Sequence, residues 1–163
     1  MIRYLIAMPR EAEIFEKVSK MCPAGSVEII GIGAVDMRPT DEDDVVVNIG
    51  YAGGYRVPVG ALVEPIIAVD GKKQTAIGIN PLFPVERRVC FTCDEFVTEP
   101  LAKYRAIYDM ELYKIARMPH KKLYSIKIVS DSLNERACES FNLEDPWRVA
   151  AGYIAEYVKE DRR

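Results

Sequence analysis

Apolar and polar residues along this chain follow the spacing of strands in some stretches and of helices in others. Short apolar runs rich in β-branched residues predict strands, because such side chains pack well on a pleated sheet. The predicted strands are Ile2–Ala7, Val27–Gly33, Val45–Ile49, Gly60–Val69, Arg88–Thr92 and Leu123–Val129. Pro65 interrupts the fourth run, which predicts an edge position or a bulge there.

Helical spacing fills several of the stretches between these strands. We predict helices from Pro9 to about Met21, from Leu101 to Tyr108 and from Met110 to Arg117. A last helix is predicted with Asp145 as N-cap and Pro146 as its first residue. Its apolar stripe consists of Trp147, Ala150, Ala151, Ile154, Tyr157 and Val158.

The alternation of strands and helices predicts an α/β fold. We expect three αβα layers around a central, mostly parallel or mixed twisted sheet. Residues 36–44 are acidic and residues 72–87 contain two X-Pro pairs, so both stretches predict loops. No linker or repeat interrupts the chain, and residues 1–163 are therefore expected to form a single domain.

One predicted strand leads directly into a glycine-rich stretch. Val45 to Ile49 is apolar enough for a strand buried on both faces, and Gly50, Gly53 and Gly54 follow it. Glycine permits backbone angles and close ligand approach that other residues do not. We expect a ligand-binding loop after this strand, with an ordinary tight turn as the alternative.

Composition and charge narrow the class of protein. The chain has 163 residues, 49% of them hydrophobic, which suits one ordinary domain with a substantial core. Its 22 basic and 25 acidic residues are spread evenly, so no basic footprint for nucleic acid exists. No apolar run reaches the length of a membrane span, and the N-terminus lacks the features of a signal peptide. We expect a cytoplasmic protein without nucleic-acid or membrane partners.

The cysteines do not predict a metal or redox site. A cytoplasmic location would keep all four of them reduced. Cys90 and Cys93 form a C-x-x-C pattern, but a strand would place their side chains on opposite faces. His120 is the single histidine available to complete a zinc site.

Several predicted strands end in polar residues that could share one site. Glu11 follows the first strand, the glycine-rich stretch follows the central one, residues 94–96 follow another, and Asp131 follows the last. Ligands of α/β sheets bind at the carboxyl ends of strands, so we expect these residues to converge.

The order of these pieces resembles that of the nucleoside phosphorylase and nucleosidase superfamily, and most closely that of the methylthioadenosine/S-adenosylhomocysteine nucleosidases. The pieces that carry the resemblance are Ala7-Met8-Pro9-Arg10-Glu11, Gly31-Ile32-Gly33, Val47-Asn48-Ile49-Gly50-Tyr51-Ala52-Gly53-Gly54, Cys93-Asp94-Glu95-Phe96-Val97, Asp109-Met110-Glu111 and Val129-Ser130-Asp131. It runs from the N-terminus to the last helix and implies a nucleoside phosphorylase-like domain.

The resemblance implies hydrolysis of the N-glycosidic bond of a purine nucleoside, without a metal or organic cofactor. Asp131 would protonate or hydrogen-bond N7 of the leaving purine, and Glu11 would activate water. Such cleavage passes through an oxocarbenium-like state, which needs an acid at the leaving group and a base at the water. The residues implied to bind substrate are Met110, Glu111, Phe96, Val97, Gly53, Ala52, Tyr51, Ser130 and Lys127.

Within that set, Met110 and Glu111 would hold the ribose and Phe96 would stack on the base. Each role has a structural alternative. Asp131 could cap the loop after its strand, Glu11 could be an ordinary first-turn acid, and Met110 and Phe96 could belong to the core.

The resembling enzymes complete their sites with a neighbouring subunit, which implies a homodimer. Tyr4, Tyr51 and Tyr55 are candidate interface aromatics.

The chain departs from the family pattern in several places. It is shorter between Glu11 and Val45, so residues 36–44 must bridge directly to the central strand. Tyr51 replaces a serine, which predicts a narrower ribose or water subsite. Lys127 replaces an arginine, and Asp109 replaces a glutamate.

Two alternatives to hydrolysis stay open. A phosphorylase would need an anion site, for which Arg10, Arg56 and Lys127 are the candidates. A non-catalytic nucleoside-binding protein of the same fold is the other alternative, motivated by the shortened chain and by Tyr51.

Overall fold

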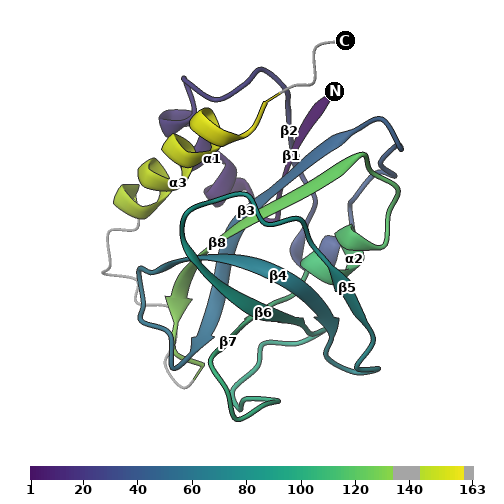
Figure 1. Cartoon of the computed structure of the whole chain (residues 1–163), viewed down its shortest axis with the longest axis vertical. Helices are drawn as coiled ribbons and strands as arrows, with labels where there is room; N and C mark the ends of the chain where they lie inside the picture. The colour runs from purple at the N-terminus through teal and green to yellow at the C-terminus, as the bar shows by residue number, and fades with distance from the viewer. Residues whose placement is uncertain (134–143, 160–163) are drawn as a thin grey trace.

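The computed structural model describes residues 1–133 and 144–159, which form one mixed sheet with helices packed on it (Figure 1). In chain order the elements are β1 (Ile2–Ile6), α1 (Pro9–Val18), β2 (Ser26–Ile29), the 3₁₀ helix η1 (Ile32–Ala34), β3 (Val45–Tyr55), β4 (Leu62–Asp70), β5 (Ala76–Gly78), β6 (Glu86–Thr92), β7 (Ala106–Asp109), α2 (Leu112–Ala116), β8 (Lys122–Asp131) and α3 (Glu144–Tyr157). Among these described residues, none of the helices combines the length and the apolarity that crossing a membrane requires.

The pairing of β3 organises the eight-stranded sheet. On one side β3 pairs with β8 in parallel from Val45 through Gly53. On its other side the first half of β3 pairs in parallel with β1, and its end, Gly53 to Tyr55, pairs antiparallel with β7. On this side, β3 therefore takes part in a parallel pairing with β1 and in an antiparallel pairing with β7.

Beyond its first half the sheet closes on itself. β8 pairs with β4, β4 with β6, β6 with β7, and β7 with β3, so five strands form a ring of hydrogen-bonded neighbours. The buried side chains gathered from this ring include Ala52, Ala68, Cys90, Ile107 and Val129. The mixed α/β fold is confirmed. The predicted three-layer arrangement is not, because part of the sheet is a closed ring and not a flat layer.

Two hydrophobic clusters pack on opposite faces of the open part of the sheet. Val45, Val47 and Ile49 face α1 and α3, which lie side by side in Figure 1. Val46 faces the other way, into a cluster that contains Leu112 of α2. The alternation follows from the two-residue period of a strand and explains why this run is apolar on both faces.

Trp147 is the largest side chain in the first cluster. It is 0% exposed, and its ring centroid lies 6.5 Å from that of Phe15 and 5.6 Å from that of Tyr51. It thereby connects α3 both to α1 and to the central strand. The predicted apolar stripe is confirmed at Ala150, Ala151, Ile154 and Val158, which are also buried, but it is wrong at Tyr157, which is 36% exposed.

The glycine-rich stretch is part of β3 and not a turn after it. Gly50 and Gly53 both pair with β8, and their backbone angles are not in the left-handed region. The predicted helix from Leu101 to Tyr108 is also wrong, since Ala106–Asp109 forms β7. Four apolar-rich residues suit either state, and pairing with β3 and β6 on both sides decides for the strand.

Several boundaries differ by a few residues from the prediction. α1 ends at Val18, β2 ends at Ile29, and the loop predicted at 72–87 contains the short strand β5. α3 begins at Glu144, so Asp145 lies inside the helix and is not its N-cap. The bulge predicted at Pro65 is confirmed, because the register with β6 shifts between Pro65 and Ile67.

The acidic stretch 36–44 bridges to β3 without a helix or strand, as expected. Arg3 binds it to the sheet, donating at 3.0 Å to Asp44 and at 2.7 Å to each oxygen of Glu28. The prediction of Tyr4 as an interface residue is wrong. Its ring is 2% exposed, and its hydroxyl donates to the Pro23 carbonyl at 2.6 Å.

Trp147→Ala should destabilise the protein by about 3–5 kcal/mol, because it empties the contact between α3, α1 and β3. Val149 lies on the same helix but is 49% exposed, so Val149→Ala is a matched control with an expected change within about 0.5 kcal/mol. Urea unfolding of both variants measures the difference. Equal losses would show that α3 is not anchored through Trp147.

Candidate active site

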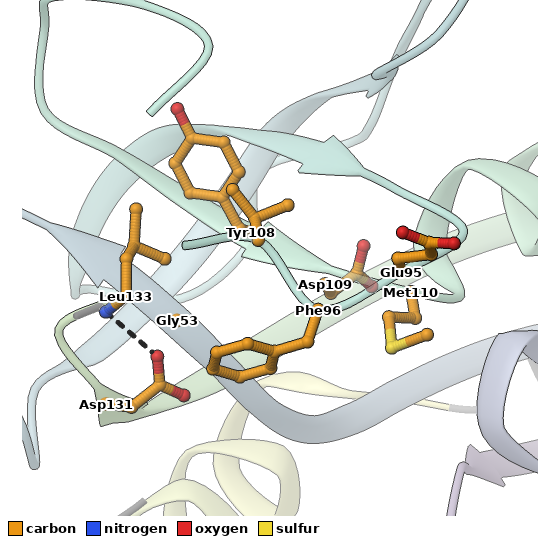
Figure 2. Close-up of a pocket in the computed structure, with 9 residues that line it drawn as sticks. Gly53, Glu95, Phe96, Tyr108, Asp109, Met110, Asp131 and Leu133 are labelled. Carbon is orange, nitrogen blue, oxygen red and sulfur yellow. Dashed lines mark hydrogen bonds between the residues drawn. The ribbon is translucent and has the colours of Figure 1, made fainter. Parts of the chain in front are cut away.

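A cavity of about 230 Å³ lies where β1, β3, β7 and β8 end. Its lining residues are Ala7, Met8, Glu11, Ile32, Tyr51, Ala52, Gly53, Phe96, Tyr108, Asp109, Met110, Glu111, Ser130 and Asp131. An adjoining compartment of about 30 Å³ shares six of them and adds Glu95, Val97 and Leu133. Figure 2 shows this compartment. The convergence of strand ends predicted from the sequence is therefore what the fold produces.

Glu11 is a buried acid in the first turn of α1. Its side chain is 2% exposed, and its Oε2 accepts a hydrogen bond from the Tyr51 backbone N–H at 3.0 Å. Burial raises the pKa of Glu11 to about 7, although the Tyr51 N–H and the nearby Lys127 charge both act to lower it. A carboxyl with this pKa exchanges a proton readily at neutral pH.

Asp131 ends β8 and lines both compartments. Its Oδ1 accepts from the Leu133 N–H at 3.1 Å, and its Oδ2 accepts from the Ser130 hydroxyl at 3.1 Å. These bonds orient the carboxyl toward the space that Phe96 borders (Figure 2). Phe96 is 56% exposed, so its ring is not part of the core.

Two glycines of β3 make room for these two acids. A Cβ on Gly50 would lie 3.0 Å from Glu11 Oε2, and a Cβ on Gly53 would lie 2.8 Å from Asp131 Oδ1. Both distances are shorter than an ordinary contact. The glycines are thus needed here for the close approach of carboxylates to the strand.

Glu111 is held by the short glycine motif. Its Oε2 accepts from the Gly33 N–H at 2.8 Å, and Lys114 donates to the Gly33 carbonyl at 2.9 Å. Gly33 has φ of 74°, a conformation that favours glycine. Burial raises the pKa of Glu111, and the Lys127 charge opposes that rise.

Asp109 and Lys127 form a buried ion pair beside the cavity. Lys127 Nζ lies 3.1 Å from Asp109 Oδ2, and the lysine is 1% exposed. Asp109 lines the cavity but Lys127 does not. Direct contact between Lys127 and a substrate therefore stays a prediction.

The structure brings the other predicted site residues together. Those that line the larger cavity are Glu11, Tyr51, Ala52, Gly53, Phe96, Met110, Glu111, Ser130 and Asp131, while Val97 lines the smaller compartment. Sequence reasoning did not select Tyr108 or Leu133. Tyr108 fell in the region misassigned to a helix, and recognising β7 would have pointed to it.

Tyr51 combines two structural contacts with its place in the lining. Its backbone holds Glu11, and its ring meets Trp147 edge-on with an interplanar angle of 88°. Part of the Tyr51 ring therefore packs against Trp147 of α3. A narrower ribose or water subsite stays a prediction.

The two cysteines of the C-x-x-C pattern differ in environment. Cys90 is buried in the ring of strands, whereas Cys93 is half-buried next to Gly71, and both are free thiols. Within residues 1–133 and 144–159, no three His, Cys, Asp or Glu side chains gather in a way that could hold a metal ion. Cys138 lies outside the described residues.

Glu11 makes the stability of the fold depend on pH. Its pKa of about 7 exceeds the ordinary 4.5, so the contribution of Glu11 to stability is fully present below pH 4.5 and is lost as the pH rises through 7. The difference corresponds to about 3 kcal/mol. Glu11→Gln should remove this loss and make the protein more stable than wild type at pH 8.

Urea unfolding at pH 5 and pH 8 measures this effect. Glu13→Gln is the matched control, because Glu13 is exposed on the same helix and should leave the pH dependence as in wild type. A Glu11→Gln protein with the wild-type slope would contradict the assignment of a high pKa to this carboxyl.

Comparison with known proteins places the fold. No family model matches the chain, and no curated protein matches it either. Solved structures do match. An MTA-bound MTAN from Chlamydia trachomatis aligns over 95% of this chain and 93% of its own, with a TM-score of 0.72 and 14% identity.

Two further structures agree with this result. A Helicobacter pylori 5′-methylthioadenosine/S-adenosyl homocysteine nucleosidase with a bound inhibitor has a TM-score of 0.66 and 16% identity, covering 95% of this chain and 96% of its own. A futalosine hydrolase mutant from the same organism has a TM-score of 0.65 and 16% identity, covering 94% and 96%. This chain therefore has the fold of the methylthioadenosine/S-adenosylhomocysteine nucleosidases, as the order of its motifs predicts.

Proposed function

We propose that this protein hydrolyses the N-glycosidic bond of a purine nucleoside, in the manner of a methylthioadenosine/S-adenosylhomocysteine nucleosidase. One observation carries the proposal: two buried carboxyl groups share one cavity but border different parts of it. Asp131 lines both compartments, whereas Glu11 lines only the larger one. Two carboxyls in different surroundings can divide the tasks of acid and base.

The reaction assigns one proton transfer to each of these groups. The bond between C1′ and N9 breaks, its electron pair goes to the purine, and Asp131 supplies a proton to N7. Water attacks C1′ from the other side and gives its proton to Glu11, which yields free base and free sugar. The pKa of about 7 suits Glu11 to accept a proton at neutral pH.

The remaining lining residues fit the two halves of a nucleoside. The exposed Phe96 ring and Asp131 border both compartments, so the purine stacks on Phe96 where the two compartments meet. Met110 lies in the lining of both compartments, and Glu111 lies only in that of the larger one. These two residues are placed to hold the ribose between base and water.

The charge of the lining favours water over phosphate as the nucleophile. Four carboxyl groups border the larger cavity, and none of the described lysines or arginines does. Arg10 and Arg56 are exposed and do not line the cavity, and Lys127 is paired with Asp109. An anion would meet a lining that carries carboxyl groups and no cation, which disfavours phosphorolysis and also nucleotides as substrates.

A panel of nucleosides assayed with and without phosphate tests the proposal. The panel includes methylthioadenosine, since a matched structure binds MTA. Free sugar is expected as the product, independent of phosphate. Sugar phosphate would indicate phosphorolysis, and binding without base release would indicate a non-catalytic nucleoside-binding protein.

Asp131→Asn should fold normally but lose on the order of 10²–10⁴-fold in turnover, because an amide cannot donate the proton of a carboxylic acid. Asp43→Asn is the control, since Asp43 is exposed in the loop before β3. Steady-state rates of base release measure both. An active Asp131→Asn protein would remove Asp131 from the catalytic role.

We also propose a homodimer whose second subunit covers the open side of the cavity. Ile32 lines the cavity yet is 54% exposed, and Val35 and Ile29 next to it are 77% and 47% exposed. Light scattering should show a dimer at micromolar concentration, and Val35→Asp should weaken it because a charge would be buried. A monomeric wild-type protein would refute this assembly.

A further inference from the structure

Lys127 is a fully buried cation whose amine does not reach the cavity. It lies in the middle of β8, opposite Gly50 of β3 and Val63 of β4, and it is 1% exposed. An ammonium in such surroundings is costly unless carboxylates compensate it. Burial would lower the pKa of Lys127, but the charges of Asp109 and Glu111 outweigh that and hold it above the ordinary value.

The elements packed around Lys127 present four titratable groups to it. Glu11 comes from α1, Cys90 from β6, Asp109 from β7 and Glu111 from the start of α2. Val63 of β4 adds no charge. The single ammonium of Lys127 thus compensates the charge of three carboxyl groups, those of Glu11, Asp109 and Glu111. Glu11 is the proposed base for water, and Glu111 is a proposed ribose ligand.

Asp109 fixes the place of this ammonium. Its Oδ1 accepts from the Thr92 hydroxyl at 2.6 Å, and its Oδ2 accepts from the Leu112 N–H at 2.8 Å. With Lys127 at 3.1 Å, the carboxylate has three donors from three different elements. It cannot rotate without losing at least one of them, so it holds the lysine in one position.

The room available there suits a lysine. Nζ lies 3.9 Å from the point where a Gly50 Cβ would stand, and Glu11 Oε2 lies 3.0 Å from that same point. Gly50 therefore lets the ammonium and the Glu11 carboxyl approach the strand from the same side. A guanidinium is larger and planar, and it would have to displace one of these neighbours.

We infer that Asp109 and Lys127 are a positioning pair: Asp109 holds the buried ammonium close to Glu11 and Glu111, where its positive charge favours the ionised form of both carboxyls. The pair acts through Glu11 and Glu111 and touches no reacting atom. The catalytic consequence rests on the proposed function, whereas the effect on the ionisation of Glu11 does not.

The two members of the pair have opposite effects on Glu11. Lys127→Met removes the charge that opposes desolvation, so the pKa of Glu11 rises above about 7. Asp109→Asn removes a negative charge, while the amide oxygen of asparagine can still accept a hydrogen bond from Lys127 and keep the ammonium in place, so the pKa of both carboxyls falls. A role limited to packing would not give shifts of opposite sign.

The experiment measures the Glu11 pKa in two independent ways. NMR titration of protein with ¹³C-labelled glutamate follows the carboxyl directly, with Glu11→Gln to identify its signal. The pH dependence of kcat/KM for nucleoside hydrolysis follows the same group through its acid limb. Arg148→Met is the control, because Arg148 forms an exposed ion pair with Glu144 on α3.

We expect the acid limb and the NMR titration to move up by at least about one pH unit in Lys127→Met, which is a tenfold loss of ionised Glu11. Asp109→Asn should move both downward, and Arg148→Met should leave both as in wild type. If Lys127→Met does not fold, Asp109→Asn still tests the pair through the downward shift expected for the Glu11 titration.

Unchanged titration of Glu11 in either neutral variant, or shifts of the same sign in both, would overturn the inference. Failure of the proposed function looks different. In that case wild type releases no base from any nucleoside, while the NMR titration of Glu11 still reports on the pair.

Discussion

The parallel pairing of β3 with β8, whose register shifts between Ala52 and Gly53, is the constraint on which the rest of the structure depends. The register aligns Gly50 with Lys127 and Gly53 with Asp131. Because the two strands run together to the same edge, the acid at the end of β8 and the glycines of β3 arrive at one place. A register slip by one residue would turn each of these side chains to the opposite face of the sheet.

The pairing of β3 with β8 also explains why the sheet has an open half and a closed half. Its first half lies beside β1 and is covered by α1 and α3 on one face, whereas its second half closes into a ring through β4, β6 and β7. The cavity forms where the open half gives way to the ring. Elements from both halves therefore line it, with Glu11 contributed by the open half and Asp109 by the ring.

Negative and positive charges lie in different places: carboxyl groups line the cavity, and the ammonium of Lys127 is buried beside it. The lining is rich in carboxyl groups, while the compensating ammonium of Lys127 is kept out of the lining and is bound to Asp109. Such an arrangement costs stability, because desolvation opposes the ionisation of Glu11 and Glu111. The lining that results carries four carboxyl groups and no lysine or arginine of the described residues.

The sequence by itself was sufficient for the α/β class, most strands, most of the buried stripe of α3 and most of the residues that border the cavity. Local periodicity and the order of short motifs carry that information. Tertiary structure alone decided that Gly50 to Gly54 continue β3, that Ala106–Asp109 is a strand, and that the sheet closes into a ring. It also decided that Lys127 lies outside the lining and meets Asp109. These outcomes depend on pairings between segments far apart in the chain, and hydrogen bonds and desolvation across such distances leave no local pattern to read.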